Sequence, residues 1–267
     1  MFRRRTPEEE AARNERYARN LLLGVAPGMR TGRRLMNRLP ADPRCKLCAS
    51  PFRGPLAPVF ALIGKKPFPG NPKYCQFCFT GLIKKRAGAE VESSYLFADV
   101  RGSTTLAEQM SPTEFRAAMD AFFSTASHVL MEHEAFVDKF VGDEVMAFFI
   151  PAFTDEQHAL RAIQAGQALL AAVAASEQPL PIGVGVHSGV AFVGTVGTDE
   201  KVEFTAMGDP VNVGARLASA AGPGEMLVSM ASLASSGLDD AGLEHRSMQL
   251  KGKTGATEVV VMAASAE

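Results

Sequence analysis

The chain has 267 residues, 46% of them hydrophobic, and a formal net charge of −1. This length exceeds one typical domain and allows a buried core, so we expect one sizeable domain with a smaller appendage. No run of eighteen apolar residues occurs, which excludes a transmembrane helix. The basic start, residues 1–5, leads into glutamates instead of an apolar stretch, so we expect no secretory signal and a cytoplasmic location.

The small net charge conceals two oppositely charged parts. Residues 1–92 hold 19 Lys and Arg against 7 Asp and Glu, a net of +12, and the remainder holds 9 against 22, a net of −13. We therefore predict a boundary near Glu92, with a basic module over 1–92 and a larger domain over 93–267. Opposite charges favour docking of the two parts. A basic module could also bind nucleic acid or an anionic membrane, but the acidic domain would repel nucleic acid.

The first predicted element is a helix from Thr6 to about Leu23. Thr6 can cap the free amide groups, a proline follows it, and three glutamates then complement the helix dipole. Gly24 is expected to end the helix. Residues 81–92 are expected to form the linker to the larger domain.

All four cysteines lie in two C-x-x-C pairs, Cys45 with Cys48 and Cys75 with Cys78. In a cytoplasmic chain this spacing favours metal ligands over disulfides. The 26 residues between the pairs are rich in proline and glycine, as expected of a loop that a metal organises. A structural Zn²⁺ ion, an iron–sulfur cluster and free redox-active thiols all remain open, and the last two would suit regulation.

Sequence patterns in the larger domain predict the order strand, helix, strand, strand, helix, strand. The elements are a strand over 95–98, a helix that starts with a capping box at Ser111, two strands around a Gly142-Asp143 turn, a helix over 155–175 and a strand over 182–187. This order predicts an α/β (α+β) fold, a ferredoxin-like βαββαβ sandwich.

Two carboxylates stand at the edges of strand-like runs, each near a glycine. Asp99 follows the run 95–98, and Asp143 follows Gly142. The predicted fold places them at adjacent strand ends. Two carboxylates brought together can hold divalent cations against a triphosphate, as is usual in phosphoryl and nucleotidyl transfer.

These motifs resemble the catalytic domain of the class III nucleotidyl cyclases, the adenylate and guanylate cyclases, over residues 94–262. The resemblance implies that Asp99, Asp143 and the backbone carbonyl of Val100 hold two Mg²⁺ or Mn²⁺ ions. It also implies a phosphorus–oxygen lyase whose metals activate the ribose 3′-hydroxyl and neutralise phosphate charge.

Two further positions match the residues with which this family reads the purine. Lys139 takes the place of the base-reading lysine, and Thr205 takes the second position, where many adenylate cyclases have aspartate and a subgroup has threonine. A lysine ammonium can donate to N1 of adenine but cannot accept from the N1–H of guanine. Guanylate cyclases tend to carry glutamate and cysteine at these positions, so the resemblance favours an adenylate cyclase that converts ATP to 3′,5′-cyclic AMP and pyrophosphate.

A helix over 211–217 carries Asn212 and Arg216, which at a spacing of four share one face. The resemblance implies that Asn212 orients the ribose, that Arg216 stabilises charge at the α-phosphate, and that Lys251 contacts the β- and γ-phosphates. His187 also fits the family, and we interpret it as structural.

The resemblance also implies a head-to-tail homodimer with two equivalent sites. In this family the metal-binding aspartates come from one subunit, and the base-reading and transition-state residues come from the other. This chain has both sets. Residues 195–203 would form an arm that wraps the partner.

Three other functions compete with this interpretation. One is a guanylate cyclase, and another is a catalytically silent cyclase-like module regulated by the cysteines. The third is a diguanylate cyclase, because residues 141–145 echo its Gly-Gly-Asp-Glu-Phe signature with valine in place of the first glycine. Intact Asp99, Asp143, Asn212 and Arg216 argue against the silent module, and the Asn212/Arg216 helix has no counterpart in diguanylate cyclases.

Overall fold

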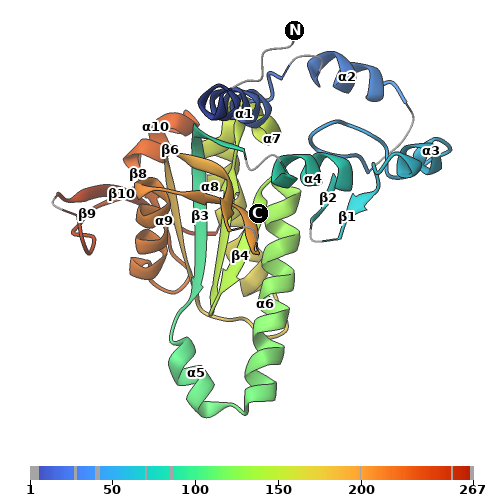
Figure 1. Ribbon diagram of the computed structural model, residues 1–267. Helices are drawn as coiled ribbons and strands as arrows, with labels where there is room; N and C mark the ends of the chain where they lie inside the picture. The colour runs from blue at the N-terminus through green and yellow to red at the C-terminus, as the bar shows by residue number, and fades with distance from the viewer. Residues whose placement is uncertain are drawn as a thin grey trace, which may run out of the picture. The chain divides into compact units, whose positions relative to one another are not determined.

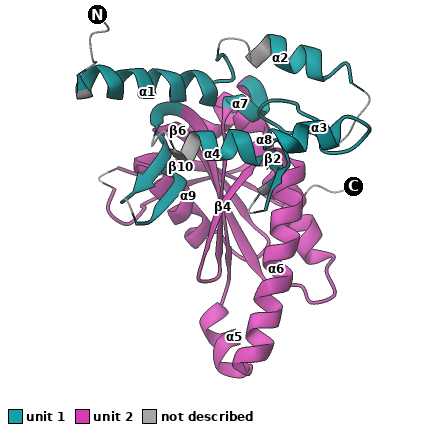
Figure 2. Cartoon of the chain, turned by 45° about the vertical axis from the view of Figure 1, so that its right-hand side comes forward, with its two compact units in different colours: residues 1–91, 151–155, 192–206 teal, residues 92–150, 156–191, 207–267 magenta. Residues whose placement is uncertain are grey.

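The computed structural model describes residues 6–26, 29–39, 43–69, 71–84, 87–198, 200–253 and 255–264. It has two compact units (Figure 2). Unit 1 comprises residues 1–91, 151–155 and 192–206, and unit 2 comprises 92–150, 156–191 and 207–267. Within the described ranges, no helix has the length and hydrophobicity that crossing a membrane requires.

Unit 1 opens with helix α1 (Pro7–Leu22), which confirms the predicted first helix. Its capping box is complete: the Glu9 amide donates to Thr6 Oγ1 at 3.2 Å, and the Thr6 amide donates to the Glu9 carboxylate at 3.0 Å. Gly24 follows the helix with a φ of +70°. A side chain there would also crowd the backbone of Ala152, so Gly24 lets the chain turn where it meets residues 151–155.

The rest of unit 1 consists of short elements and two strand ends. They are α2 (Met29–Met36), α3 (Ala57–Leu62), β1 (Pro67–Phe68), β2 (Asn71–Cys75), α4 (Gln76–Lys84), α7 (Pro151–Thr154), most of β7 (Val202–Met207), and the ends of β3 (Gly88–Val100) and β6 (Ile182–Gly197). The linker expected over 81–92 is wrong in extent, because α4 continues to Lys84 and β3 already begins at Gly88. Alternating buried residues Ala87, Ala89 and Val91 explain the early start of the strand.

Unit 2 contains the predicted βαββαβ order, which confirms the α/β sandwich. The order is β3, α6 (Pro112–Glu132), β4 (Phe136–Val141), β5 (Glu144–Phe149), α8 (His158–Ala174) and β6 (Figure 1). Helix α5 (Ser103–Gln109) and the 3-10 turn η1 (Asp155–Gln157) are additions, and α9 (Asp209–Ala220), β8 (Met226–Ser229), α10 (Met230–Ser236), β9 (Glu244–Met248) and β10 (Thr257–Met262) follow.

Strands β3 to β10 form one sheet in the order β4-β5-β3-β6-β8-β10-β9, with β7 paired to β6, and β1 pairs with β2 in a separate two-stranded sheet. Side chains of β3 alternate between its two faces. Leu96, Ala98 and Val100 join the core formed with α6 and α8. Phe97 points to the other face, where it meets Gly214 of α9. Helix α9 therefore covers the face opposite α6 and α8.

The close fit of α9 on β6 depends on Gly185. A Cβ at Gly185 would overlap the backbone of α9 at Gly214 and Ala218. Only a residue without a side chain lets strand and helix backbones approach so closely. This contact sets the short distance between α9 and the sheet.

Candidate active site

Asp99 and Glu144 face each other across the paired strands β3 and β5. Directly opposed residues project from the same face of a sheet, and this is the face that α9 covers. Asp143 lies in the turn between β4 and β5, where Gly142 adopts a φ of +65°. The Val100 amide donates to the Asp143 carbonyl at 3.4 Å, which ties the turn to the end of β3. The structure thus brings the two predicted metal-binding aspartates together.

Burial and mutual repulsion change the acidity of these carboxyl groups. Burial raises the pKa of Asp99, Asp143 adds to that rise, and the Arg101 guanidinium opposes it. Burial, with the charges of Asp99 and Asp143, raises the pKa of Glu144 to about 7. A site with this excess of negative charge, built from hard oxygen donors, suits Mg²⁺ or Mn²⁺.

Arg101 forms an ion pair with the Asp99 carboxylate. Its guanidinium also donates to the carbonyl of Ser219, near the end of α9, at 2.6 Å. Arg101 follows Asp99 by two residues and so lies on the same face of the chain. Neither Arg101 nor Glu144 was predicted from the sequence, although each lies within two residues of one of the two aspartates.

Lys139 lies on β4 opposite Met146 of β5, and Met146 in turn lies opposite Phe97 of β3. The pairing of β4 with β5 shifts register between Val137 and Lys139, so Asp138 is the extra residue of a bulge. The bulge turns Lys139 to the sheet face that Asp99 and Glu144 share. Asp138, whose side chain is only 3% exposed, lies 4.0 Å from the Lys139 ammonium.

Helix α9 carries Asn212 and Arg216, as predicted. Asn212 is exposed and Arg216 is partly exposed. Among the residues that the structure describes, neither side chain has a hydrogen-bond or ion-pair partner. Both groups are therefore available to an incoming ligand.

Lys251 lies in the turn between β9 and β10, beside Gly252, whose φ is +76°. This turn approaches α9, because a Cβ on Gly252 would lie 3.4 Å from the Arg216 guanidinium. Lys253 closes the turn by donating to Asp209, the first residue of α9, at 2.5 Å. The structure therefore places Lys251 near Arg216.

His187 belongs to a buried hydrogen-bond network that sequence reasoning missed. Its Nδ1 lies 2.8 Å from Ser229 Oγ, which contacts Ser232 at 3.1 Å. Ser188 continues the network from Ser232 to Ser94, and Ser94 lies 2.8 Å from His158 Nδ1. Burial and the Lys253 ammonium lower the pKa of His187 to about 4, against the opposing charge of Asp209. A neutral histidine held in this way is consistent with a structural role.

Thr205 is a buried residue of β7 and belongs to unit 1. Its neighbour Phe204 packs edge-on against Phe79 of α4, with ring centroids 6.2 Å apart. Paired strands β6 and β7 form a β-hairpin at the predicted arm over 195–203, of which residue 199 lies outside the described residues.

The four cysteines meet in unit 1, as predicted. Their sulfur atoms all lie within 4.8 Å of one another, and this is the one group of potential metal ligands with such spacing in the described ranges. Cys45 and Cys75 are buried, and Cys48 and Cys78 are partly exposed.

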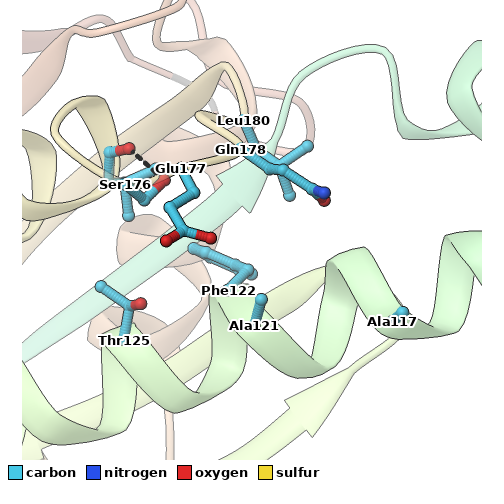
Figure 3. Close-up of a pocket in the computed structure, with 9 residues that line it drawn as sticks. Ala117, Ala121, Phe122, Thr125, Ser176, Glu177, Gln178 and Leu180 are labelled. Carbon is cyan, nitrogen blue, oxygen red and sulfur yellow. Dashed lines mark hydrogen bonds between the residues drawn. The ribbon is translucent and has the colours of Figure 1, made fainter.

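A separate hollow of about 400 Å³ lies between α6 and the segment after α8 (Figure 3). Phe122 and Thr125 line it from α6, and the Glu177 carboxylate points across it from the other side. None of the predicted site residues is among those that line it. The hollow is therefore not part of the site that contains Asp99, Asp143 and Glu144.

Comparison with known proteins identifies the family. Residues 88–263 match the family model of the adenylate and guanylate cyclase catalytic domain. The chain belongs to the class III nucleotidyl cyclases. The cyclase domain thus begins where β3 begins. It includes the segments 151–155 and 192–206, which pack in unit 1 with the residues before the domain (1–87), called the cysteine module below.

Individual relatives agree. The chain is 35% identical over 146 residues to adenylate cyclase 1 of Rhizobium meliloti (strain 1021), and 30% identical over 149 residues to an adenylate cyclase of Anabaena cylindrica. These matches cover 52% and 51% of this chain but only 22% and 28% of the relatives.

Solved structures show the same fold. The guanylyl cyclase Cya2 superposes with a TM-score of 0.62 at 25% identity, covering 67% of this chain and 95% of that one. The adenylyl cyclase CyaB from P. aeruginosa superposes with a TM-score of 0.58 at 25% identity, covering 67% and 97%. The family uses divalent metal ions, which fits the carboxylate donors of this chain.

Proposed function

We propose that this cyclase converts ATP to 3′,5′-cyclic AMP and pyrophosphate. The observation that carries the proposal is the placement of Lys139 on the sheet face that also presents Asp99 and Glu144. Because one chain presents its base-reading cation and its metal-binding carboxylates on the same face, a head-to-tail dimer can bring Lys139 of one chain to the base of a nucleotide whose phosphates the aspartates of the other chain hold. The lysine ammonium can only donate hydrogen bonds, which suits N1 of adenine and not the N1–H of guanine.

Asp99, Asp143 and the Val100 carbonyl would hold two Mg²⁺ or Mn²⁺ ions, which supply charge neutralisation at the phosphates and activation of the ribose 3′-hydroxyl. Arg101 pairs with Asp99 and would balance part of the charge of this carboxylate where no metal ion is bound. The carbonyl of Val100 lies next to Asp99 on the strand end that the Asp143 turn anchors.

In the reaction, the 3′-oxygen attacks the α-phosphorus, the bond from that phosphorus to the bridging oxygen breaks, and the 3′-hydroxyl loses its proton. Pyrophosphate leaves with the bonding electron pair. Lys139 and Thr205 would hold the adenine, and Asn212 would orient the ribose. Arg216 would stabilise the charge that develops at the α-phosphate, and Lys251 would bind the β- and γ-phosphates.

We further propose that the active enzyme is a head-to-tail homodimer. Arg216 and Asn212 have no partner among the described residues, which supports a role toward a nucleotide held by the aspartates of a second chain. Each dimer would then have two equivalent sites. A reducing, ATP-rich cytoplasm suits both this substrate and four reduced cysteines.

The test is turnover of ATP and GTP by the purified chain, with Mg²⁺ and Mn²⁺ compared and the cyclic product identified by mass spectrometry. We expect 3′,5′-cyclic AMP and a preference for ATP. Preferential formation of cyclic GMP would overturn the base assignment, and the absence of any cyclic nucleotide with either metal would indicate a silent module.

A further inference from the structure

The spacing of the four cysteine sulfur atoms matches the coordination sphere of one ion. In a tetrahedral zinc site, Zn–S bonds of about 2.3 Å place the sulfur atoms about 3.8 Å apart. Cys48 Sγ and Cys75 Sγ lie 3.8 Å apart, and all four sulfur atoms lie within 4.8 Å of one another. In an iron–sulfur cluster the thiolates bind different iron atoms, so the inorganic core spreads them further apart.

Backbone groups around the sulfur atoms already point toward them. The Cys75 amide donates to Cys45 Sγ at 3.2 Å, and the Cys78 amide donates to Cys75 Sγ at 3.4 Å. Ser50 Oγ, in a fully buried residue, lies 3.2 Å from Cys48 Sγ. Such bonds orient thiolates and stabilise their charge around a metal.

The first C-x-x-C pair closes into a tight loop. The Ala49 amide donates to the Cys45 carbonyl at 2.8 Å, and Ala49 adopts a φ of +57°. A positive φ is unfavourable for alanine, so the loop needs an external constraint to hold it. A metal ion bound by Cys45 and Cys48 supplies that constraint.

The cysteine module packs on two segments of the cyclase domain within unit 1. Phe79 follows Cys78 on α4, stacks on Phe68 at 4.2 Å, and meets Phe204 of β7. Tyr74, which precedes Cys75, packs on Phe153 of α7 at 4.9 Å. The residues next to the second C-x-x-C pair therefore join the metal ligands to β7, the strand of Thr205.

We propose that Cys45, Cys48, Cys75 and Cys78 bind a single Zn²⁺ ion, and that this ion keeps α4 packed against β7. The ion joins two segments that are otherwise separated by a loop of 26 residues (49–74). It acts as a structural clamp between the basic module and the cyclase domain. The proposal of a zinc site does not depend on whether the cyclase uses ATP or GTP.

The first test is the metal content of the full chain, purified without oxygen from medium that supplies both iron and zinc. We expect one zinc per chain, no acid-labile sulfide and a colourless protein. Iron with or without sulfide, or no metal with four reactive thiols, would overturn the proposal. Replacing the ion by Co²⁺ should give the intense visible bands of tetrahedral cobalt thiolate, and weak octahedral bands would contradict four-sulfur ligation.

Two variants distinguish a residue that binds the zinc ion from a residue that only lies beside the ligands. Cys75→Ser should weaken zinc retention against a chromophoric chelator by at least ~100-fold, because one of four ligands is lost. Phe77→Ala, within the same C-x-x-C pair but 61% exposed, should keep one zinc per chain. Equal retention in the two variants would refute the ligand assignment.

Hydrogen exchange tests the clamp. Removing zinc should speed amide exchange in β7 at least ~10-fold while leaving β8, in the core of unit 2, unchanged. Phe79→Ala should keep the zinc and still speed exchange in β7, because it removes the ring that contacts Phe204. Unchanged amide exchange in β7 after zinc removal would refute the clamp. The assignment of zinc to the four cysteines would then rest on the metal content alone.

Discussion

Lys253 donates a hydrogen bond to Asp209 at 2.5 Å and so fastens the turn of Lys251 to the first residue of the helix that carries Asn212 and Arg216. This ion pair joins the two structural elements that we expect to bind the triphosphate and the ribose. Asp209 is 64% exposed, so the pair itself contributes little to folding stability. Its value lies in positioning Lys251 relative to Arg216.

Lys253→Ala should therefore lower kcat/KM for the nucleotide by about tenfold, because small misplacements of binding groups are costly in catalysis. The midpoint of thermal unfolding should stay unchanged. Asp209→Ala should have a similar effect, and the double variant should lose little more than either single one. Arg116→Ala, which breaks the exposed ion pair with Asp120, is the matched control and should change neither quantity. Additive losses in the double variant would show that the two residues act separately.

Asp143→Ala should reduce cyclase activity by at least ~10³-fold, because the site loses a charged metal ligand. Circular dichroism should show a folded protein, since Asp143 lies in a turn and not in the core. Asp120→Ala removes an exposed carboxylate of α6 and should keep full activity. Activity of Asp143→Ala near the parent level would exclude Asp143 as a metal ligand.

Lys139→Glu combined with Thr205→Cys should lower ATP turnover and shift the ratio of GTP to ATP turnover toward GTP. The change replaces a donor by an acceptor at the purine edge. The measurement is kcat/KM for both nucleotides in the parent and the double variant. An unchanged preference for ATP would show that Lys139 does not read the base.

His187 should make the protein sensitive to mild acid. Its native pKa of about 4 lies below the value of 6.5 expected for an unfolded chain, so only the unfolded state binds a proton between these pH values. The free energy of unfolding should therefore fall as the pH drops from 6.5 to 4, by up to about 3 kcal/mol from this group. The charges that face it are Lys253, which lowers its pKa, and Asp209, which raises it.

Urea unfolding of His187→Asn measures this contribution, because the asparagine amide can still reach Ser229 but does not titrate. We expect a flatter dependence of unfolding free energy on pH in that range. Burial also lowers the pKa of His158, so part of the slope should remain. The matched control, His245→Gln on the surface, should leave the slope as in the parent. A parental slope in His187→Asn would contradict the buried, neutral state.

The sequence predicted the elements whose signals are local. The capping boxes at Thr6 and Ser111 start α1 and α6, and Gly142 turns the hairpin of Asp143. It also predicted that the four cysteines meet, because their spacing is itself a signal of a shared ligand. Local sequence patterns are sufficient to predict an element where its position requires a particular residue type, such as a capping residue or a turn glycine.

Contacts between residues far apart in the chain could not be predicted from the sequence. Nothing in the sequence near Lys139 shows the bulge at Asp138 that turns it to the face of Asp99. The ion pair of Lys253 with Asp209, and the contact of Phe79 with Phe204, join residues more than forty positions apart. The serine and histidine network is likewise made by packing, since each serine alone is an ordinary strand or cap residue.

Subunit complementation tests the central claim, that each site combines the aspartates of one chain with Arg216 of the other. Asp99→Ala and Arg216→Ala should each be nearly inactive, because both sites of either homodimer carry the same defect. After mixing and subunit exchange, about half of the dimers are mixed, and each mixed dimer has one intact site of two. Activity should then recover to roughly a quarter of the parent level. A mixture that stays as inactive as its components, despite demonstrated exchange, would contradict the shared site.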